Sequence, residues 1–228
     1  MESVMVFVLG LGIRLVLFVL LFTAFAVPVA AVVFAVEGVA SLRSRAKGTV
    51  DAGGVFYKPG VAYTPAHAWV KRLWGRQVRV GLDDVARRVL SGVSSIALPP
   101  VGLRLREGDL LAAVRCGHRL VAIPSPVAGV IVERNRSLTD RPSLFEREPY
   151  HRGWMLRVET DGAPAKNAHQ GPEAKAWLRG ENLRLTHLLE ARLGLTAADG
   201  GALTGTPATL LSPEAWREVA EQFLRSAS

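Results

Sequence analysis

Hydrophobic residues in this sequence are concentrated near the N-terminus. From Leu15 to Val36 there is no charged residue. At a helical rise of about 1.5 Å per residue this stretch reaches roughly 33 Å, which matches the hydrocarbon core of a bilayer. We therefore expect a transmembrane helix within residues 3–37, in which Pro28 is tolerated because bilayer helices adjust locally around proline.

Two other interpretations of this segment fit less well. A cleaved signal peptide has a basic start and a shorter apolar run, whereas this chain opens with Met1-Glu2-Ser3. A buried core helix does not require so long an apolar stretch. Arg14 is expected to snorkel to the lipid headgroups or to face a polar partner helix, because a lone arginine at mid-bilayer is costly.

Positive charge follows the apolar segment, in a juxtamembrane tether predicted for residues 38–66. The basic residues there are Arg43, Arg45 and Lys47. A bias of lysine and arginine retains the adjoining domain in the cytoplasm. We expect a single-pass protein of a bacterial-type inner (cytoplasmic) membrane, with the N-terminus out and the C-terminal domain cytoplasmic. Arg14, on the other side of the span, favours the opposite orientation.

Short apolar and β-branched runs, separated by turn formers, occupy residues 67–161. The runs are Ala68 to Val70, Gln77 to Val80, Ser94 to Leu98, Leu110 to Val114, Leu120 to Ile123, Gly129 to Val132 and Trp154 to Val158. A helix is expected after Asp83, which can cap it, with Val85 and Val89 on one face. Many short strands with frequent turns predict a small, mainly β barrel or sandwich.

A helical extension is predicted for residues 173–228, after a linker at residues 162–172 that is rich in Ala, Gly and Pro. A first helix carries Trp177 in an apolar stripe. A second begins at Ser212-Pro213, with serine as the cap and proline in the first helical position. Its Trp216 and Phe223 lie on one apolar face. The tryptophans and Phe223 are candidate contacts for a partner, although packing against the chain's own barrel accounts for them equally well.

Composition and charge narrow the function classes. The formal charge is +8 over 228 residues, which suits a domain beside anionic lipid. Nucleic-acid binding is disfavoured, because the basic residues are dispersed and no binding motif accompanies them. A single cysteine, Cys116, excludes a disulfide framework within the chain and a cysteine-based zinc site. The histidines show no metal-ligand spacing, so no metal is predicted.

A set of short motifs from His67 to Glu159 resembles the glycine cleavage H protein family. The motifs are His67-Ala68-Trp69-Val70, Val80-Gly81-Leu82-Asp83-Asp84, Leu98-Pro99-Pro100-Val101-Gly102, Glu107-Gly108-Asp109-Leu110, Ser125-Pro126-Val127-Ala128-Gly129, Glu148-Pro149-Tyr150 and Gly153-Trp154. Each motif is weak alone, but their order and spacing together are specific. The resemblance implies a barrel-sandwich hybrid with a lysine at the tip of a β-hairpin that carries lipoate.

The lipoyl position of this sequence holds a histidine. Counting without gaps from Gly108-Asp109 and from Ser125-Pro126 places the family's modified lysine at His118, flanked by Arg115, Cys116, Gly117 and Arg119. An imidazole cannot form the stable amide that lipoylation requires. No lysine lies between Lys71 and Lys166, so a shift of register does not restore the site. We expect no lipoylation at the hairpin, no cofactor and no enzymatic activity.

Three functions follow from these patterns. The leading hypothesis is a membrane-anchored accessory subunit, whose lipoyl-type domain docks to other subunits of a membrane complex and takes no small-molecule substrate. The second is a carrier that holds lipoate or another group non-covalently or through Cys116, whose thiol pKa the flanking Arg115 and Arg119 would lower. The third, an efflux adaptor, needs a long helical hairpin that Val114 to Leu120 cannot contain.

Overall fold

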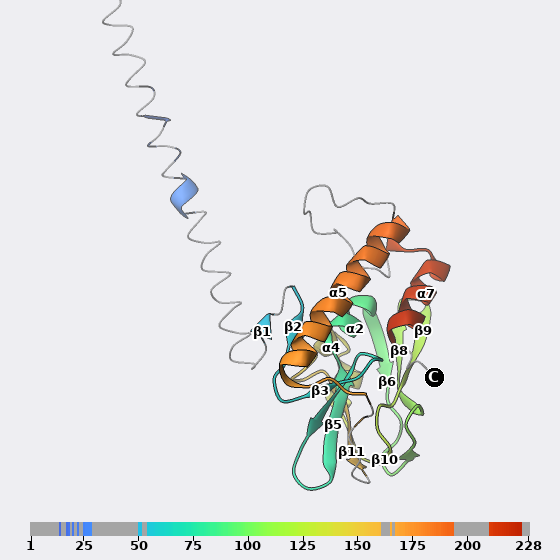
Figure 1. The fold of residues 1–228 in the computed structure, drawn as a ribbon. Helices are drawn as coiled ribbons and strands as arrows, with labels where there is room; N and C mark the ends of the chain where they lie inside the picture. Colours follow the sequence, from blue (N-terminus) through green and yellow to red (C-terminus); the bar gives the residue numbers. More distant parts are fainter. Residues whose placement is uncertain are drawn as a thin grey trace, which may run out of the picture. The chain divides into compact units, whose positions relative to one another are not determined.

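The computed structural model describes residues 54–160, 165, 167–193 and 210–224, the backbone of residues 50–51, and residues 14, 17, 18, 20, 22 and 25–28 (Figure 1). The chain divides into two compact units, Met1–Lys47 and Gly48–Ser228. Each unit is a separate packing body, and the second contains the folded domain.

The N-terminal unit is helical at its described positions. Arg14 is exposed there, as are Phe18 and Phe25. Within the described residues no helix has both the length and the hydropathy needed to cross a membrane. Most of the span predicted within residues 3–37 lies outside those residues, and so do Arg43, Arg45 and Lys47.

Antiparallel sheets build the second unit. A six-stranded sheet has the order β3 (Ala62–Tyr63), β4 (Ala68–Arg72), β5 (Gln77–Leu82), β11 (Trp154–Thr160), β10 (Gly129–Arg134) and β7 (Arg104–Leu105). A three-stranded sheet has the order β6 (Val93–Ala97), β8 (Leu110–Cys116) and β9 (Arg119–Pro124), and β1 (Val50–Asp51) pairs with β2 (Phe56–Tyr57). The strands predicted from the seven apolar runs are all present.

Five helices are described in this unit. They are α2 (Asp84–Val89), α3 (Arg136–Asp140), α4 (Ser143–Arg147), α5 (Gly171–Leu193) and α7 (Pro213–Leu224). The Asp83 carboxylate caps α2 as predicted, since its Oδ1 accepts from the backbone N–H groups of Val85 and Ala86. The hydroxyl of Ser212 accepts from the backbone N–H of Ala215 at the start of α7.

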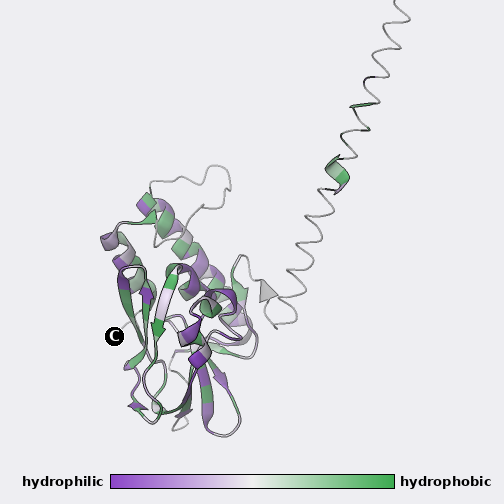
Figure 2. Cartoon of the chain, turned by 180° about the vertical axis from the view of Figure 1, so that it is seen from behind, coloured by the Kyte–Doolittle hydropathy of each residue, from purple (hydrophilic) through white to green (hydrophobic). Residues whose placement is uncertain are grey.

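One hydrophobic core joins the sheets and the helices. Leu111 and Ile123 of the smaller sheet, Met155 of the larger sheet, and Leu178 and Phe223 of α5 and α7 belong to the same buried cluster. Figure 2 shows hydrophobic and hydrophilic residues mixed along these elements, as expected where each has one buried face. The C-terminal helices therefore complete the β domain rather than forming a second one.

The domain begins earlier than the sequence suggested. Val55, Tyr57, Val61 and Tyr63 are buried in the core, so the prediction of a tether is wrong for this part of residues 38–66. The Tyr63 hydroxyl accepts from the backbone N–H of Lys58 and donates to its carbonyl, which anchors the segment. Strands of two residues, such as β2 and β3, show too little periodicity to be predicted from the sequence. The short α3 and α4 were not predicted either.

Two glycines are required by close packing between sheet elements. A Cβ on Gly81 would lie 2.6 Å from Cζ2 of Trp69, a fully buried neighbour on the paired strand. A Cβ on Gly129 would lie 2.2 Å from the carbonyl oxygen of Glu159, and Gly129 has φ 152°. Both glycines belong to the motifs that carry the family resemblance.

We expect Gly81→Ala to lower the free energy of unfolding by about 1–3 kcal/mol, because the methyl group overpacks the Trp69 ring. Gly180→Ala is the matched control, since nothing lies within 4 Å of its added Cβ on the exposed side of α5. That change should stabilise the helix by up to about 1 kcal/mol. Urea unfolding of the full chain in detergent measures both, and equal effects would contradict the packing argument.

Candidate functional site

The hairpin formed by β8 and β9 has a two-residue turn at the predicted lipoyl position. Cys116 and Arg119 are the last paired residues, and Gly117 and His118 form the turn. Gly117 has φ 59°, whereas His118 is not among the residues with positive φ. Glycine at the first central position is typical of the type II′ turn, which matches the twist of an antiparallel hairpin. His118 is therefore at the tip, as the motif count predicted.

The tip presents polar and apolar groups to solvent. His118 and Arg115 are exposed, and Leu120 on the following strand is 61% exposed. The described lysines, Lys58, Lys71 and Lys175, lie on other elements. The hairpin thus offers an imidazole and guanidinium groups, but no amine that could be acylated, so its residues do not fit covalently bound lipoate.

Cys116 points into the domain. Its side chain is buried, and Sγ lies 3.2 Å from the carbonyl oxygen of Leu90. Burial raises the pKa of the Cys116 thiol to about 12, and the Glu146 carboxylate adds to this effect against the opposing influence of Arg119. The prediction that neighbouring arginines lower this pKa is wrong, because desolvation outweighs their charge.

Arg119 connects the hairpin to α7. Its Nη2 donates to the carbonyl of Leu211 at 3.1 Å, and its guanidinium lies 5.1 Å from the ring centre of Trp216. The indole Nε1 of Trp216 donates to the carbonyl of Val89 at 3.2 Å. A hollow of about 700 Å³ lies between hairpin residues 116–122 and α7. The hairpin is therefore braced along one side by the C-terminal helix.

The aromatic residues predicted as partner contacts belong to the core instead. Trp216 is 3% exposed and Phe223 is fully buried, so neither is available to a partner while α7 is docked. Trp177 is half-buried between two histidine rings. Of the two interpretations of this apolar face, packing against the chain's own barrel is the one that the structure shows.

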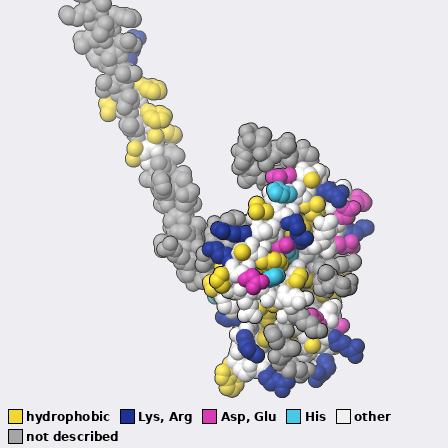
Figure 3. Space-filling view, viewed as in Figure 1, with side chains coloured by type: hydrophobic (Ala, Val, Ile, Leu, Met, Phe, Trp, Pro, Cys, Tyr) yellow, Lys and Arg dark blue, Asp and Glu magenta, His cyan; other side chains and the backbone are white. Residues whose placement is uncertain are grey.

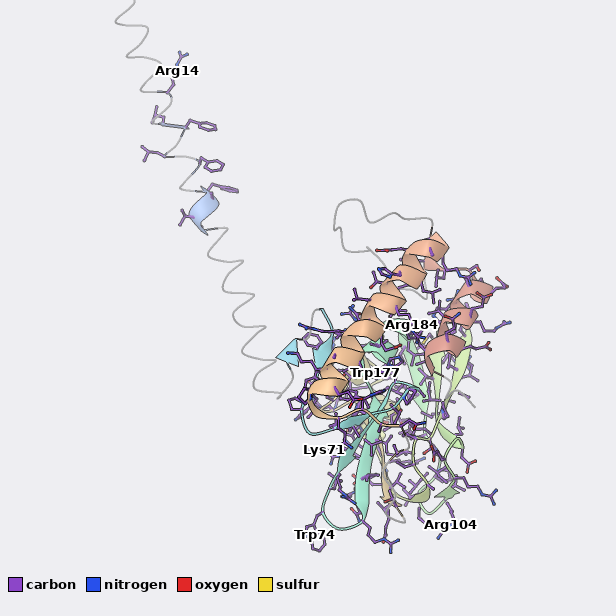
Figure 4. All side chains as sticks on the ribbon, viewed as in Figure 1. Arg14, Lys71, Trp74, Arg104, Trp177 and Arg184 are labelled. Carbon is purple, nitrogen blue, oxygen red and sulfur yellow. The ribbon has the colours of Figure 1, made fainter. Side chains whose placement is uncertain are left out.

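A buried histidine lies where α5 and α7 meet the barrel. The imidazole Nδ1 of His67 is 2.9 Å from Oδ2 of Asp83, the residue that caps α2, and Nε2 is 3.5 Å from Oε2 of Glu181 on α5. The ring stacks on Trp177 of α5 at 5.0 Å and on Phe223 of α7 at 5.6 Å. Figure 4 shows Trp177 and Arg184 on the same helix, α5. Arg184 in turn lies over the Phe223 ring, 4.3 Å from its centre.

The backbone holds His67 in an uncommon conformation. Its φ is 56°, in the left-handed region that non-glycine residues seldom adopt. Two hydrogen bonds fix it, from the His67 N–H to the carbonyl of Thr64 and from the Asp83 N–H to the carbonyl of His67, both at 2.9 Å. This conformation directs the imidazole to Asp83 and into the aromatic stack, and these contacts compensate for the backbone strain.

The two carboxylates keep the imidazole charged. Burial by itself would lower the pKa of His67, but Asp83 and then Glu181 more than offset this, and the pKa rises to about 9. In return, contact with His67 and Arg184 lowers the pKa of the Glu181 carboxyl, although its partial burial acts in the opposite direction. An imidazolium thus joins the cap of α2 to α5 in the interior.

In the part of the chain that the structure describes, no three histidine, cysteine or acidic residues are placed to share an ion. What the geometry defines is a two-sheet β domain with an exposed hairpin tip, the architecture of lipoyl-type carrier domains.

Comparison with known proteins gives the same class. The family model for the glycine cleavage H-protein matches residues 61–178. The glycine cleavage system H protein of Mycobacterium avium is 35% identical over 107 residues, which cover 47% of this chain and 81% of that protein. The probable H protein of Thermococcus gammatolerans is 31% identical over 110 residues, 48% of this chain and 81% of that one.

A crystal structure of a glycine cleavage system H protein from Mycobacterium marinum matches 54% of this chain and 99% of that chain, with 25% identity and a TM-score of 0.48. On the extent of the family match and of the sequence identities, this chain belongs to the glycine cleavage H-protein family. The family region contains the barrel, the hairpin and the first part of α5.

The charged contact between His67 and the C-terminal helix predicts pH-dependent stability. The pKa of His67 is about 9 in the folded domain and about 6.5 in an unfolded chain. Because the folded value is the higher, the stabilisation is complete below pH ~6.5 and is lost as the pH rises through about 9. The urea concentration at the unfolding midpoint of the full chain should therefore decrease as the pH is raised from about 6.5 to about 9.

His67→Gln should remove this slope, and Glu181→Gln should reduce it. His187→Gln provides the control, because His187 is exposed on the same helix as Glu181, and its substitution should leave the slope unchanged. A midpoint that is independent of pH in the unsubstituted protein would show that His67 is not charged inside the domain.

Proposed function

We propose that this chain is a non-catalytic, membrane-anchored accessory subunit, which uses a non-lipoylated H-protein domain as a docking module in a larger membrane complex. The observation that carries the proposal is the exposed His118 at the turn of the β8–β9 hairpin. Members of this family are lipoyl carriers, and their chemistry requires an amine at this position. A domain that keeps the fold and lacks the amine retains a surface but not the carrier function.

The shape of the hairpin supports a docking role. His118, Arg115 and Leu120 are exposed together at its end, which gives a small surface with an apolar centre and basic edges. The bracing of Arg119 by Leu211 and Trp216 restricts motion of the strands. A rigid surface loses little conformational entropy on binding, which favours association.

Membrane attachment rests on the uncharged sequence from Leu15 to Val36 and on the basic residues that follow it. An anchored domain meets its partner in two dimensions and at high effective concentration. A small exposed surface is then sufficient for a stable complex. In this proposal the domain is cytoplasmic, beside anionic lipid.

A carrier role through Cys116 has little support. The thiolate is the reactive form of cysteine, and a buried thiol with a pKa of about 12 remains protonated at neutral pH. Cys116 is also only 3% exposed, and its Sγ contacts the carbonyl oxygen of Leu90 inside the domain.

The intact mass of the full chain tests the absence of a carried group. The chain is expressed together with a lipoate ligase and free lipoate, next to a lipoylated H protein as positive control. We expect the unmodified mass for this chain and a lipoylated mass for the control. A lipoyl or thiol-linked adduct, located by peptide mapping at the hairpin, would overturn the proposal.

Copurification after gentle detergent extraction tests the docking role. We expect the chain to elute with other membrane subunits, and Leu120→Asp at the tip to release them, because a charge enters the centre of the contact. Leu110→Asp is the matched control: Leu110 is 46% exposed at the far end of the same hairpin, and its change should leave the complex intact. A chain that elutes alone as a monomer would argue against any subunit role.

A further inference from the structure

A second hollow, of about 840 Å³, lies on the outer side of the six-stranded sheet and is lined by residues of β4, β5, β10 and the segment that precedes β11. Six basic side chains line it, namely Lys58, Lys71, Arg79, Arg134, Arg136 and Arg152. Glu133 is the one carboxylate in the lining. Lysine and arginine are also the prevailing charged residues at the lower end of the barrel, while acidic residues are concentrated nearer the helices (Figure 3).

The sheet itself brings like charges together. Lys71 of β4 is the cross-strand partner of Arg79 of β5, Arg79 is the partner of Arg157 of β11, and Arg157 is the partner of Glu133 of β10. Directly opposed side chains have Cβ atoms about 5 Å apart, and like charges in such pairs are destabilising. Glu133 forms an ion pair with Arg157. The Glu133 carboxylate is therefore already engaged, and no described carboxylate is paired across the sheet with Lys71 or Arg79.

Among the described residues, the cations proposed to bind the anion have no acidic partner. Within the described residues, no carboxylate lies at ion-pair distance from Lys71, Arg79, Arg134, Arg136 or Arg152. The Arg79 guanidinium lies over Trp154, 4.9 Å from the ring centre, and its buried Nε has no hydrogen-bond partner. Buried donors of this kind are uncommon in proteins and call for an explanation.

Hydrogen bonds fix the walls of the hollow. The buried Asn135 amide donates to the carbonyls of Arg152 and Trp154, both at 2.7 Å. These two bonds hold the segment that carries Arg134 and Arg136 beside the segment that carries Arg152. The arginines of the two segments are thus brought together by buried contacts and not by chance proximity of surface side chains.

The pKa of Lys58 is affected by the positive charges of the hollow. Its Nζ donates to the carbonyl of Tyr150 at 3.0 Å. Partial burial lowers the pKa of Lys58, and the charges of Lys71 and Arg79 lower it further. A positive potential of this kind attracts anions.

We propose that this hollow binds a phosphate-bearing anion, held by Lys71, Arg79 and the arginines at positions 134, 136 and 152. Its volume is within the usual range of small-molecule sites, about 300–1,000 Å³. Arginine side chains supply the paired donors that match phosphate oxygens. A phosphate group reaches this site either as a diffusible ion or as the headgroup of an anionic lipid, and both present the same chemistry to the five cations. The site is separate from the hairpin, so it does not depend on the docking role.

Titration calorimetry of the full chain in neutral detergent tests the site and distinguishes the two sources. Pyrophosphate is the diffusible probe, short-chain phosphatidylglycerol below its micellar concentration is the lipid probe, and short-chain phosphatidylcholine is the control. We expect pyrophosphate or phosphatidylglycerol to bind and phosphatidylcholine not to bind. Whichever of the two binds more tightly identifies the source.

Substitutions locate the binding. Lys71→Gln and Arg79→Gln should each weaken binding about tenfold or more, since each removes charge-assisted hydrogen bonds. Lys175→Gln is the control, with the same loss of charge on α5. Thermal unfolding without ligand adds a second readout: Lys71→Gln should be at least as stable as the unsubstituted chain, because the repulsion with Arg79 is removed. Equal weakening by all three substitutions, or no binding of either anionic probe, would overturn the proposal.

Discussion

The buried side chain of His67 makes the interactions on which the arrangement of this domain depends. It lies between the carboxylates of Asp83 and Glu181 and stacks on Trp177 and Phe223. An uncompensated buried charge is expensive, whereas one with two carboxylate partners is tolerated. Removal of either C-terminal helix would expose the cation and its aromatic neighbours together. His67 thus adds a polar contact to the hydrophobic core that joins the barrel and the helices.

This coupling has consequences at the hairpin. Docking of α7 places Trp216 under the Arg119 guanidinium, and Trp216 in turn bonds to the end of α2. The carrier hairpin of an H-protein-type domain is therefore supported along one side by a helix that lies beyond the family region of residues 61–178. A helix that supports this hairpin is consistent with the proposed docking surface.

The charge of the domain is distributed unevenly over its surface. The exposed hairpin and the basic hollow are built on different sheets, so a partner and an anion can be bound at the same time. The proposed membrane attachment would bring such cations near phosphate headgroups. The cross-strand repulsion of Lys71 and Arg79 lowers stability, and a bound anion would offset that cost.

Much of this architecture follows from the sequence alone. Short apolar and β-branched runs between turn formers predicted the seven longer strands. Asp83 and Ser212-Pro213 marked the starts of α2 and α7, and the motif spacing placed His118 at the hairpin tip. These features are local or depend on spacing along the chain, so no knowledge of tertiary contacts is needed. The sequence also determines that the tip carries no amine.

Only the tertiary structure decided the rest, because the forces involved act between residues far apart in sequence. Burial, not the neighbouring arginines, sets the pKa of Cys116, and packing against the barrel removes Trp216 and Phe223 from the surface. Residues 55–66 were predicted to be part of a tether, but in the structure their apolar side chains pack in the core. Docking of α5 brings Glu181 to His67, and the register of β4 and β5 pairs Lys71 with Arg79. No local sequence pattern encodes either contact.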